Sequence, residues 1–419
     1  MKTISPFRTG AALAVAALLA QMTTAQNSLA GQQIAPGYAH PASHVKVARS
    51  QPAATTSPTG FTPDQIRQAY GFDQLSLDGT GQTIAIIDAF GDRYSTITTN
   101  TVTVHHKTKT TYTTNYFDAT EGDWTTFCNQ FGLATNGLTV AYPQGQGSVS
   151  TDWARETALD IQWAHAIAPR AKIMLVISYD NTMANLYGAV DYAVSNGANI
   201  VSMSWGRGEF SGEASDDAHF NHPGVTFLAA SMDSGEISSG VFYPSASPYV
   251  VAVGGTQLTN YNGTWSETAW SGSGGGISLY ETMPAFQSGW QQYTTGNMRS
   301  APDVCYQGGP SPGVSVYVTP YYGGWIQVYG TSVGTPQWAA LIALVNSGRA
   351  SSLSSANSAI YSLAPTGTTP PSVDTGLLND IISGSNGGDP DDFAIPGYDF
   401  VTGLGSPVAS QLVPALTSW

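Results

Sequence analysis

At residues 329–345 the chain reads YGTSVGTPQWAALIALV, a turn of small residues that runs into an apolar, alanine-rich segment. Gly330 and Gly334 let the backbone approach another group closely, and the hydroxyl of Ser332 lies between them at the start of a predicted helix. Backbone N–H groups and the helix dipole favour negative charge at such a position. Two interpretations remain open at this point. Thr331 or Ser332 caps the helix, or Ser332 is a nucleophile, which then needs a base from elsewhere in the chain.

Apolar strands alternate with helical segments ahead of this stretch. Continuous apolar runs of this kind are typical of strands that a parallel sheet covers on both faces. The predicted strands span residues 83–88, 171–177, 199–204, 225–231 and 249–253, and the predicted helices span residues 61–70, 151–165, 183–196 and 213–222. The alternation predicts an α/β fold with a doubly wound, mostly parallel sheet and helices on both faces. Ligands bind beyond the carboxyl ends of the strands in such sheets, so we expect the site there.

The composition is that of a globular protein with few surface charges. Charged residues make up 10% and hydrophobic residues 42% of the 419 residues. Asp and Glu number 28 against 14 Lys and Arg, and the formal net charge of −14 argues against a nucleic-acid partner and suits an acidic medium. We expect a monomer.

The start of the chain predicts export. Lys2 and Arg8 precede an apolar run at residues 11–20, and residues 1–25 as a whole resemble a secretory signal. The apolar run is too short to span a bilayer, and no later run approaches ~20 apolar residues, so we expect a soluble secreted protein without a membrane anchor. Residues 26–60, rich in Gln, Ser, Ala, Pro and Thr, predict a flexible leader or short prosegment without visible chemistry.

Residues 93–115 are rich in Thr, Tyr, His and Lys, which predicts a polar surface hairpin or extended insertion. Adjacent residues of an extended segment point to opposite faces, so a solvated pair is favoured over a metal site for His105 and His106. Cys128 and Cys305 either form one disulfide in an oxidising compartment or stay reduced and buried.

Three acidic residues are candidates for a functional role in addition to Ser332. Glu156 and Asp160 are spaced i, i+4 on the predicted helix at residues 151–165, so they share a face although like charges at that spacing destabilise a helix. Either the face is exposed and the cost is small, or the pair is kept for proton chemistry. Asp233 follows a buried strand and is either a turn cap or a functional acid.

A series of motifs along the chain indicates a known protein family. They are Glu156-x-x-x-Asp160, Ser202-Met203-Ser204-Trp205-Gly206, Asp233-Ser234-Gly235, Val253-Gly254-Gly255-Thr256, Ala301-Pro302-Asp303-Val304, and Gly330-Thr331-Ser332 with Thr335-Pro336. In this order they resemble the sedolisin family, the serine-carboxyl peptidases with a subtilisin-like fold. The resemblance covers residues 61–419, which we expect to form a single catalytic domain.

The resemblance assigns roles to four residues. It implies that Ser332 is the nucleophile, Glu156 its general base, Asp160 the group that orients and supports Glu156, and Asp233 the acid of the oxyanion hole. The expected activity is that of a secreted endopeptidase on polypeptides. A Glu base has an ordinary pKa of about 4.3, and Asp233 has to stay protonated to donate a hydrogen bond, so the expected activity is bell-shaped in pH and acidic.

The resemblance also implies one structural calcium ion in a loop at residues 379–405. Its ligands would be the side chains of Asp380 and Asp399 and the main-chain carbonyls of Ile381, Ile395 and Gly397, and such hard oxygen donors are what calcium requires. The nearby acids Asp389, Asp391 and Asp392 lack the full spacing of an EF-hand and are interpreted as turn or solvated residues.

The sequence departs from the family pattern in three places. Sedolisins typically carry a long folded prodomain, whereas only the leader at residues 26–60 stands between the predicted signal and the catalytic domain. The insertion at residues 93–115 is foreign to the pattern. Met232 stands where a glycine is usual before Asp233, which bears on the oxyanion turn.

Two other functions compete with that of a serine-carboxyl peptidase. Asp88 ends a strand much as the aspartate of a histidine-dependent subtilisin does, but no histidine stands in a His-Gly-Thr helix start, so Asp88 is interpreted as structural. The other rival is a catalytically inactive, secreted peptide-binding protein on the same scaffold. Labelling of Ser332 by an active-site reagent at acidic pH separates the two.

Overall fold

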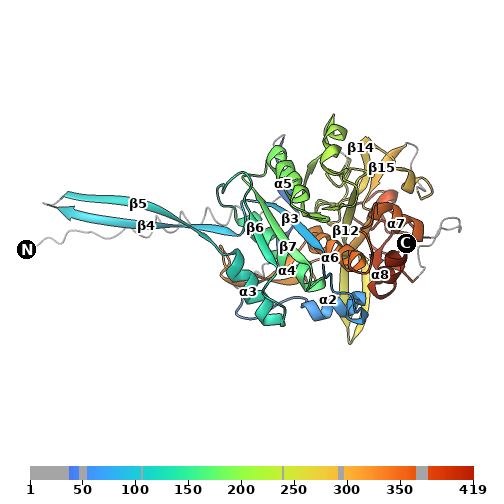
Figure 1. Cartoon of the computed structure of the whole chain (residues 1–419), viewed down its shortest axis with the longest axis horizontal. Coiled ribbons are helices and arrows are strands. Elements are labelled where there is room, and N and C mark those ends of the chain that lie inside the picture. The colour runs from blue at the N-terminus through green and yellow to red at the C-terminus, as the bar shows by residue number, and fades with distance from the viewer. Residues whose placement is uncertain (1–36, 47–53, 105–106, 238–239, 291–296, 365–375) are drawn as a thin grey trace, which may run out of the picture. The chain divides into compact units, whose positions relative to one another are not determined.

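An eight-stranded sheet runs through the described part of the chain (Figure 1). Seven strands follow the order β13-β12-β10-β8-β3-β7-β6, and β16 pairs with β12. In chain order the strands are β3 (Thr83–Ala89), β6 (Leu138–Ala141), β7 (Lys172–Ser178), β8 (Ile200–Met203), β10 (Thr226–Ala230), β12 (Val250–Tyr261), β13 (Thr264–Ala269) and β16 (Val304–Gln307). All pairs are parallel except β12 with β13. The predicted doubly wound, mostly parallel sheet is therefore confirmed.

Helices cover both faces of this sheet. They are α2 (Pro63–Tyr70), α3 (Thr120–Phe131), α4 (Thr151–Ile167), α5 (Met183–Ser195), α6 (Gly334–Ser347), α7 (Ala356–Leu363) and α8 (Ala409–Ser418). Along β3, Ile84 and Ile86 pack into one core cluster with residues of α4 and α6, whereas Ala85 and Ile87 pack into a second cluster with residues of α5. Because successive side chains of a strand point to opposite faces, α4 and α6 lie on one face and α5 on the other.

The helix ends follow from local chemistry. At the start of α2, Pro63 is the first helical residue, and Thr62 and Gln65 form a capping box. Short 3-10 helices link other elements: η1 (Phe72–Gln74), η2 (Glu213–His219), η3 (Ala285–Gln287), η4 (Thr331–Val333) and η5 (Pro390–Asp392). The helix predicted at residues 213–222 is thus a 3-10 helix and a shorter one.

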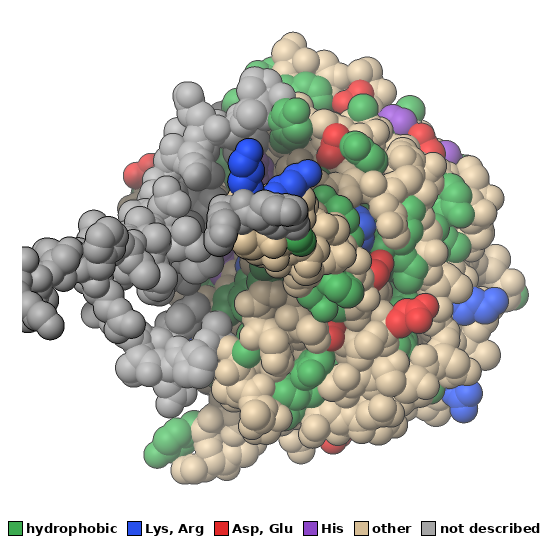
Figure 2. All heavy atoms as spheres, turned by 90° about the vertical axis from the view of Figure 1, so that its left-hand side faces the viewer, with side chains coloured by type: hydrophobic (Ala, Val, Ile, Leu, Met, Phe, Trp, Pro, Cys, Tyr) green, Lys and Arg blue, Asp and Glu red, His purple; other side chains and the backbone are tan. Residues whose placement is uncertain are grey.

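The polar insertion is a long two-stranded hairpin made of β4 (Arg93–Val104) and β5 (Lys107–Asp118). The strands pair in unbroken antiparallel register from Arg93 with Asp118 to Val104 with Lys107, and Figure 1 shows the hairpin extending away from the sheet. The pair His105 and His106 lies outside the described residues. Charged side chains are sparse on the face seen in Figure 2.

The remaining strands lie outside the eight-stranded sheet. They are β1 (His40–Pro41), β2 (His44–Val45), β9 (Trp205–Gly208), β11 (Phe242–Tyr243), β14 (Gly276–Thr282), β15 (Met298–Ala301), β17 (Val314–Val318), β18 (Gly324–Tyr329), β19 (Leu378–Asn379) and β20 (Ser406–Pro407). β1 pairs with β9 and β2 with β18, both antiparallel. The leader predicted as flexible therefore contains two strands held by hydrogen bonds to β9 and β18.

The computed structural model describes residues 37–46, 54–104, 107–237, 240–290, 297–364 and 376–419. The predicted signal at residues 1–25 lies outside these ranges, and so do residues 26–36 and 47–53 of the predicted leader. Within them, every helix is too short or too polar to cross a membrane. Cys128 and Cys305 are both free and buried, so the reduced alternative is confirmed and the disulfide alternative is wrong.

Candidate active site

Ser332 lies in η4, between the end of β18 and the start of α6. It is fully buried, and its hydroxyl donates to the carbonyl of Ser204 at 3.4 Å. Neither η4 nor α6 has a side-chain cap, and the hydroxyl of Thr331 donates instead to Asp233 at 2.8 Å. The capping interpretation of this turn is therefore wrong. The hydroxyl of Ser332 faces the Ser204 carbonyl and the Glu156 carboxyl instead.

Glu156 and Asp160 are fully buried on α4. The alternative of an exposed acidic face is therefore wrong. Burial raises the pKa of the Glu156 carboxyl well above its ordinary value, and the charge of Asp88 adds to this. The hydroxyls of Ser332 and Ser43 lie close enough to the carboxylate to lower that pKa in part. Glu156 is thus a buried carboxyl beside the hydroxyl of Ser332, the arrangement that a general base needs.

Asp160 lies deeper in the same cluster. Burial raises its pKa well above its ordinary value, the charges of Asp88 and Glu156 raise it further, and the nearby hydroxyl of Ser204 acts against them. Asp88, interpreted from the sequence as structural, ends β3 fully buried against these two acids. Three carboxyl groups in one low-dielectric place cannot all be ionised, so the cluster holds protons that can move between them.

Asp233 reaches the same turn from the loop after β10. Its Oδ1 accepts the backbone N–H and the hydroxyl of Thr331, each at 2.8 Å, so it is not a cap of its own turn. Met232 has φ +76°, in the left-handed region that glycine adopts at less cost. The turn before Asp233 therefore keeps the backbone form usual for a glycine although a methionine stands there.

Gly330 lets the Asp233 carboxyl and the Ala42 carbonyl lie close to the backbone of this turn. Its φ is +134°, and a Cβ atom there would lie 2.4 Å from both the Asp233 Oδ2 atom and the carbonyl oxygen of Ala42. A side chain would displace both groups. The sequence therefore correctly marks Gly330 as a point of close backbone approach.

The leader residues Ala42, Ser43 and His44 enter the site, which the sequence did not predict. The carbonyl of Ala42 accepts the backbone N–H of Ser332 at 3.1 Å, the hydroxyl of Ser43 donates to Glu156 Oε2, and His44 Nε2 lies 3.1 Å from Asp233 Oδ2. This part of the leader has neither an apolar period nor a motif. This part of the leader reaches the site because its backbone lies between the edges of β9 and β18.

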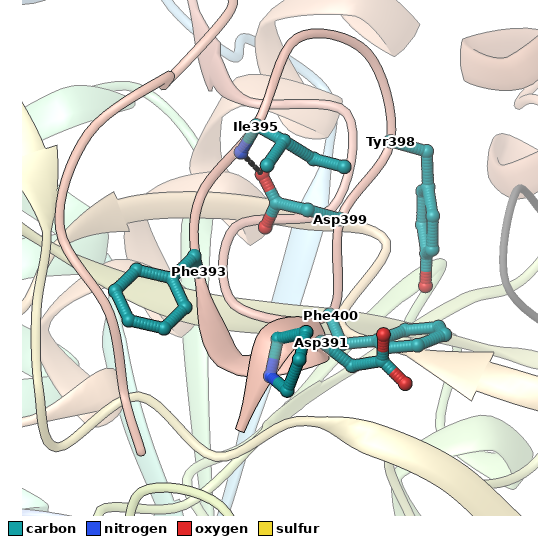
Figure 3. A pocket seen from close by; sticks show the side chains of 7 residues that line it. Asp391, Phe393, Ile395, Tyr398, Asp399 and Phe400 are labelled. Atoms are coloured by element: carbon teal, nitrogen blue, oxygen red, sulfur yellow. Dashed lines mark hydrogen bonds between the residues drawn. The ribbon is translucent and has the colours of Figure 1, made fainter. Parts of the chain in front are cut away.

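The loop assigned to calcium brings its predicted residues together. Both side-chain oxygens of Asp380 accept the N–H of Gly397, at 3.0 and 3.2 Å, and Asp399 Oδ2 accepts the N–H of Ile395 at 3.1 Å (Figure 3). Asp399 is buried, and burial raises the pKa of its carboxyl to about 7. Ile381 follows Asp380 directly and is also buried. Two aspartates that converge on one loop backbone fit an oxygen-coordinated cation.

The side chains alone do not complete such a site. Among the described residues, no group of three His, Cys, Asp or Glu side chains is placed to hold a metal. Carbonyl oxygens of the loop would have to supply the other ligands, as the resemblance implies for Ile381, Ile395 and Gly397. Asp389 and Asp392 form a capping box at η5, which confirms them as turn residues.

Comparison with known proteins identifies the family of the chain. Residues 79–364 match the subtilase family, Peptidase_S8. The chain is 33% identical to kumamolisin of Bacillus sp. (strain MN-32) over 88% of this chain and 65% of kumamolisin. It is 29% identical to xanthomonalisin of Xanthomonas sp. (strain T-22) over 68% of this chain and 40% of xanthomonalisin. The chain thus spans less than two thirds of the length of these curated relatives.

A solved structure has the same fold. It is Pseudomonas sedolisin, a serine-carboxyl proteinase, complexed with two molecules of pseudo-iodotyrostatin. The match has a TM-score of 0.69 and 26% sequence identity, and it covers 86% of this chain and 99% of that chain. A similarity of this extent places the sheet, its helices and the loops at the carboxyl ends of the strands in one architecture.

Proposed function

The chain belongs to the sedolisins within the subtilase family, and from that membership we propose that it is a secreted serine-carboxyl endopeptidase that cleaves polypeptides at acidic pH. The observation that supports this most is the meeting of Ser332, Glu156 and Asp233 at one buried turn, from three separate elements. A helix cap or a plain surface turn would need none of these acids.

The proposed reaction passes through an acyl-enzyme. Glu156 takes the hydroxyl proton of Ser332 as the oxygen attacks the peptide carbonyl, and the same proton then goes to the leaving amine. The backbone N–H of Ser332 and the protonated carboxyl of Asp233 donate to the oxyanion. Asp160 supports the position and the proton balance of Glu156. Water then hydrolyses the ester by the same steps in reverse order.

The pH range follows from two opposite requirements. Glu156 has to be ionised to accept a proton, and Asp233 has to be protonated to donate one, so activity falls on both sides of an acidic optimum. Burial and the Asp88 charge raise the pKa of Glu156, so the acid limb lies above the value for a free glutamate.

We further propose that the loop with Asp380 and Asp399 binds one calcium ion, completed by the carbonyls of Ile381, Ile395 and Gly397. The ion would supply rigidity rather than chemistry, because it would tie together two stretches of the chain that meet at this loop. The convergence of both carboxylates on one backbone supports the assignment.

The decisive experiment measures cleavage of a peptide library between about pH 3 and pH 7. Ser332→Ala should abolish turnover, and Glu156→Gln should reduce kcat/KM by roughly 10²–10⁴-fold, the usual contribution of a general base. Ser288→Ala, at an exposed serine outside the site, is the matched control and should act as the wild type does.

Turnover by Ser332→Ala at acidic pH would contradict the assignment of the nucleophile. If the wild type cuts nothing and an active-site phosphonate fails to label Ser332, the protein is instead a peptide-binding protein on a peptidase scaffold.

A further inference from the structure

The β4–β5 hairpin leaves one long strand edge without a partner. Among the described residues, β4 pairs with β5 alone, from Arg93 with Asp118 to Val104 with Lys107. Figure 1 shows that both strands extend away from the eight-stranded sheet. The main-chain groups on the outer edge of β4 therefore have no neighbouring strand to bond. A two-stranded hairpin is at best marginally stable in water, so a further strand on this edge would stabilise it.

The edge of β4 lacks the features that protect exposed strand edges from other chains. Lysine, proline and β-bulges are the usual means of protection. Residues 94–104 contain no charged residue and no proline, and β4 follows β5 without a bulge. Residues 96–99 and 101–104 are all β-branched, which favours an extended backbone. An unprotected edge of this kind is a template for pairing with another strand.

The other edge of the hairpin is protected. Lys107 and Lys109 lie near the tip of β5, and both are exposed. Residues 94–117 contain no acidic side chain that would neutralise them. The hairpin thus has one unprotected edge, on β4, and one edge that carries charge, on β5.

A second copy of the chain fits the unprotected edge. Its own β4 has the same length and the same uncharged composition, so two β4 strands can pair antiparallel about a two-fold axis without opposing like charges. The sheet formed in this way has the strand order β5-β4-β4-β5. Lys107 and Lys109 then lie on both outer edges, where they prevent the addition of further strands. A two-fold contact of this kind closes after two copies.

The side chains of β4 support one register for this pairing. Opposed residues of antiparallel strands share a face, so an axis at Thr98 sets Tyr94 opposite Val102 of the partner subunit. The ring of Tyr94 stacks on Phe117 of its own hairpin at 5.2 Å between centroids, and Val102 is 60% exposed. The pairing would extend this contact by an aromatic and β-branched pair, a combination that stabilises sheets.

We propose that this chain forms a dimer in which the β4 strands of two copies pair antiparallel into one four-stranded sheet. The proposal concerns assembly and does not rest on the proposed peptidase activity. A monomer is expected from the sequence, where an unpaired strand edge is not visible. Because the base of one hairpin lies beside the tip of the other, the two catalytic domains join opposite ends of the shared sheet.

The size of the contact predicts a weak dimer. A strand of twelve residues reaches about 40 Å, and an edge about 10 Å thick buries roughly 400 Å² on each copy. The total of roughly 800 Å² is below the range of about 1,200–2,000 Å² for stable interfaces. We therefore expect a Kd on the order of 1–100 μM.

Sedimentation equilibrium at about pH 5 tests the dimer. The full chain carries Ser332→Ala, which prevents digestion during the run. Its average mass should rise from that of one chain near ~1 μM toward that of two chains near ~500 μM. Excision of residues 94–117 should keep the mass at one chain, and the same excision in the active chain should leave peptide cleavage unchanged. A full chain that stays monomeric at the highest concentration would overturn the proposal.

Two matched double variants test which edge is used. Thr96→Lys with Thr98→Lys places charge at the axis of β4 and should weaken the dimer at least roughly tenfold, because like charges then oppose each other. Thr113→Lys with Asn115→Lys changes the cross-strand partners of these residues on β5, and the dimer should persist. Both variants lose the hydrogen bond from Asn115 to the Thr98 hydroxyl, so they differ only in the edge that is charged. Equal dimerisation of the two variants would overturn the assignment to β4.

A cross-link tests the register. Paired Cα atoms of antiparallel strands lie about 4.5–5.5 Å apart, which is within the range of a disulfide. Thr98→Cys should therefore form a disulfide-linked dimer under mild oxidation, and Thr113→Cys should not. Cys128 and Cys305 are buried and do not compete. A Thr98→Cys chain that stays unlinked would overturn the proposed axis.

An extended segment of a polypeptide substrate is the other strand that this edge could bind. In that case the wild type would stay monomeric, and excision of residues 94–117 would raise the KM for a denatured protein but not for a short peptide. This result would overturn the dimer. A dimer that cuts no peptide would leave this proposal standing and contradict the proposed function instead.

Discussion

Asp88 is a buried carboxyl whose protonation state makes the stability of the fold depend on pH. It has no exposed surface, and burial raises its pKa to about 7, with the nearby Thr157 hydroxyl partly offsetting this. A group whose pKa is higher in the folded than in the unfolded state binds more protons when folded. Its contribution to stability is complete below the unfolded pKa, near 4, and is lost as the pH rises through about 7.

Asp88→Asn should therefore raise the thermal midpoint at pH 8 by at least ~2 °C and change it little at pH 4. The amide keeps the shape of the protonated acid and cannot ionise. Thermal unfolding followed by circular dichroism at the two pH values checks this. A variant that is equally destabilised at both would show that Asp88 stabilises the fold in its ionised form.

The contacts of single residues mark the limit of what the sequence predicts. Glu156 and Asp160 were found because their spacing on one helix is visible in the sequence. The contacts of Ser43 with Arg155 and Glu156 join residues more than a hundred positions apart. No local sequence pattern encodes these contacts. Pairing with the edges of β9 and β18 fixes the position of the leader backbone, and the Ser43 hydroxyl then bonds to Glu156 and Arg155 because they lie next to it.

Among the elements, the β4–β5 hairpin forms a sheet of its own, separate from the eight-stranded sheet. Its strands pair with each other, and threonine hydroxyls meet across it, Thr103 with Thr108 at 3.1 Å and Thr101 with Thr110 at 3.4 Å. At its base Arg93 donates to the carbonyl of Gly147 at 2.9 Å. Twelve residues per strand reach about 40 Å, with most side chains exposed.

Excision of residues 94–117, with a short glycine linker between Arg93 and Asp118, should change the thermal midpoint by less than ~3 °C. Exposed strands that pair only with each other bury little apolar surface and contribute little to the stability of the core. A parallel excision that also removes Arg93 is the control and should cost more. A large loss in the first variant would contradict this account of the hairpin.

The loop with the proposed calcium site is the second element with a measurable consequence. A chelator should lower the thermal midpoint by several degrees, because an ion present at 100 times its Kd stabilises the folded state by about 2.7 kcal/mol. Asp399→Asn should remove the difference between chelated and calcium-loaded protein, and Asp391→Asn, at an exposed acid, should keep it. Equal midpoints in the wild type with and without chelator would leave the loop without its proposed ion.

Elements were predicted best where burial is strong. The continuous apolar run at Thr83–Ala89 can only be a strand covered on both faces, and it lies at the centre of the sheet. The helix predicted at residues 213–222 became the shorter η2, because a polar surface segment has no apolar stripe to hold a longer helix. The strands of the leader could not be predicted, since two-residue strands depend entirely on the edges they join.

For the whole molecule, buried carboxyl pairs predict stability in acid. Asp92 lies near Asp123, Glu213 near Glu209, and Glu281 near Asp217, and in each pair the neighbouring carboxyl raises the pKa of the first-named acid in addition to burial. Burial is the main cause that raises the pKa of Glu213 to about 9 and that of Glu281 to about 7. A shared proton is needed in each pair, and deprotonation leaves two like charges in a poorly solvated place.

The thermal midpoint should therefore be highest near pH 4–5 and fall from about pH 7 to pH 9. The folded state holds more protons than the unfolded state across this range, so each such group removes up to about 1.4 kcal/mol of stability per pH unit. The formal charge of −14 adds repulsion in the same direction. Calorimetry in a pH series measures the slope.

A double variant, Glu213→Gln with Glu281→Gln, is the matched test of the cause. Its midpoint should depend less on pH than that of the wild type, because two of the groups that release protons are gone. A wild-type midpoint that stays level from pH 5 to pH 9 would show that the pairs do not control stability.

The edges of β9 and β18 bear on which substrates the proposed peptidase could reach. They bond the leader through main-chain groups on both sides, so a strand that already has a partner would not fit between them. Under the proposed function, a folded substrate would first have to release an extended segment from its own sheet or helix, and the rate of digestion would be set by how often the substrate opens. An acidic medium that leaves this protein folded would unfold many other proteins, and would therefore favour the digestion of substrates over self-digestion.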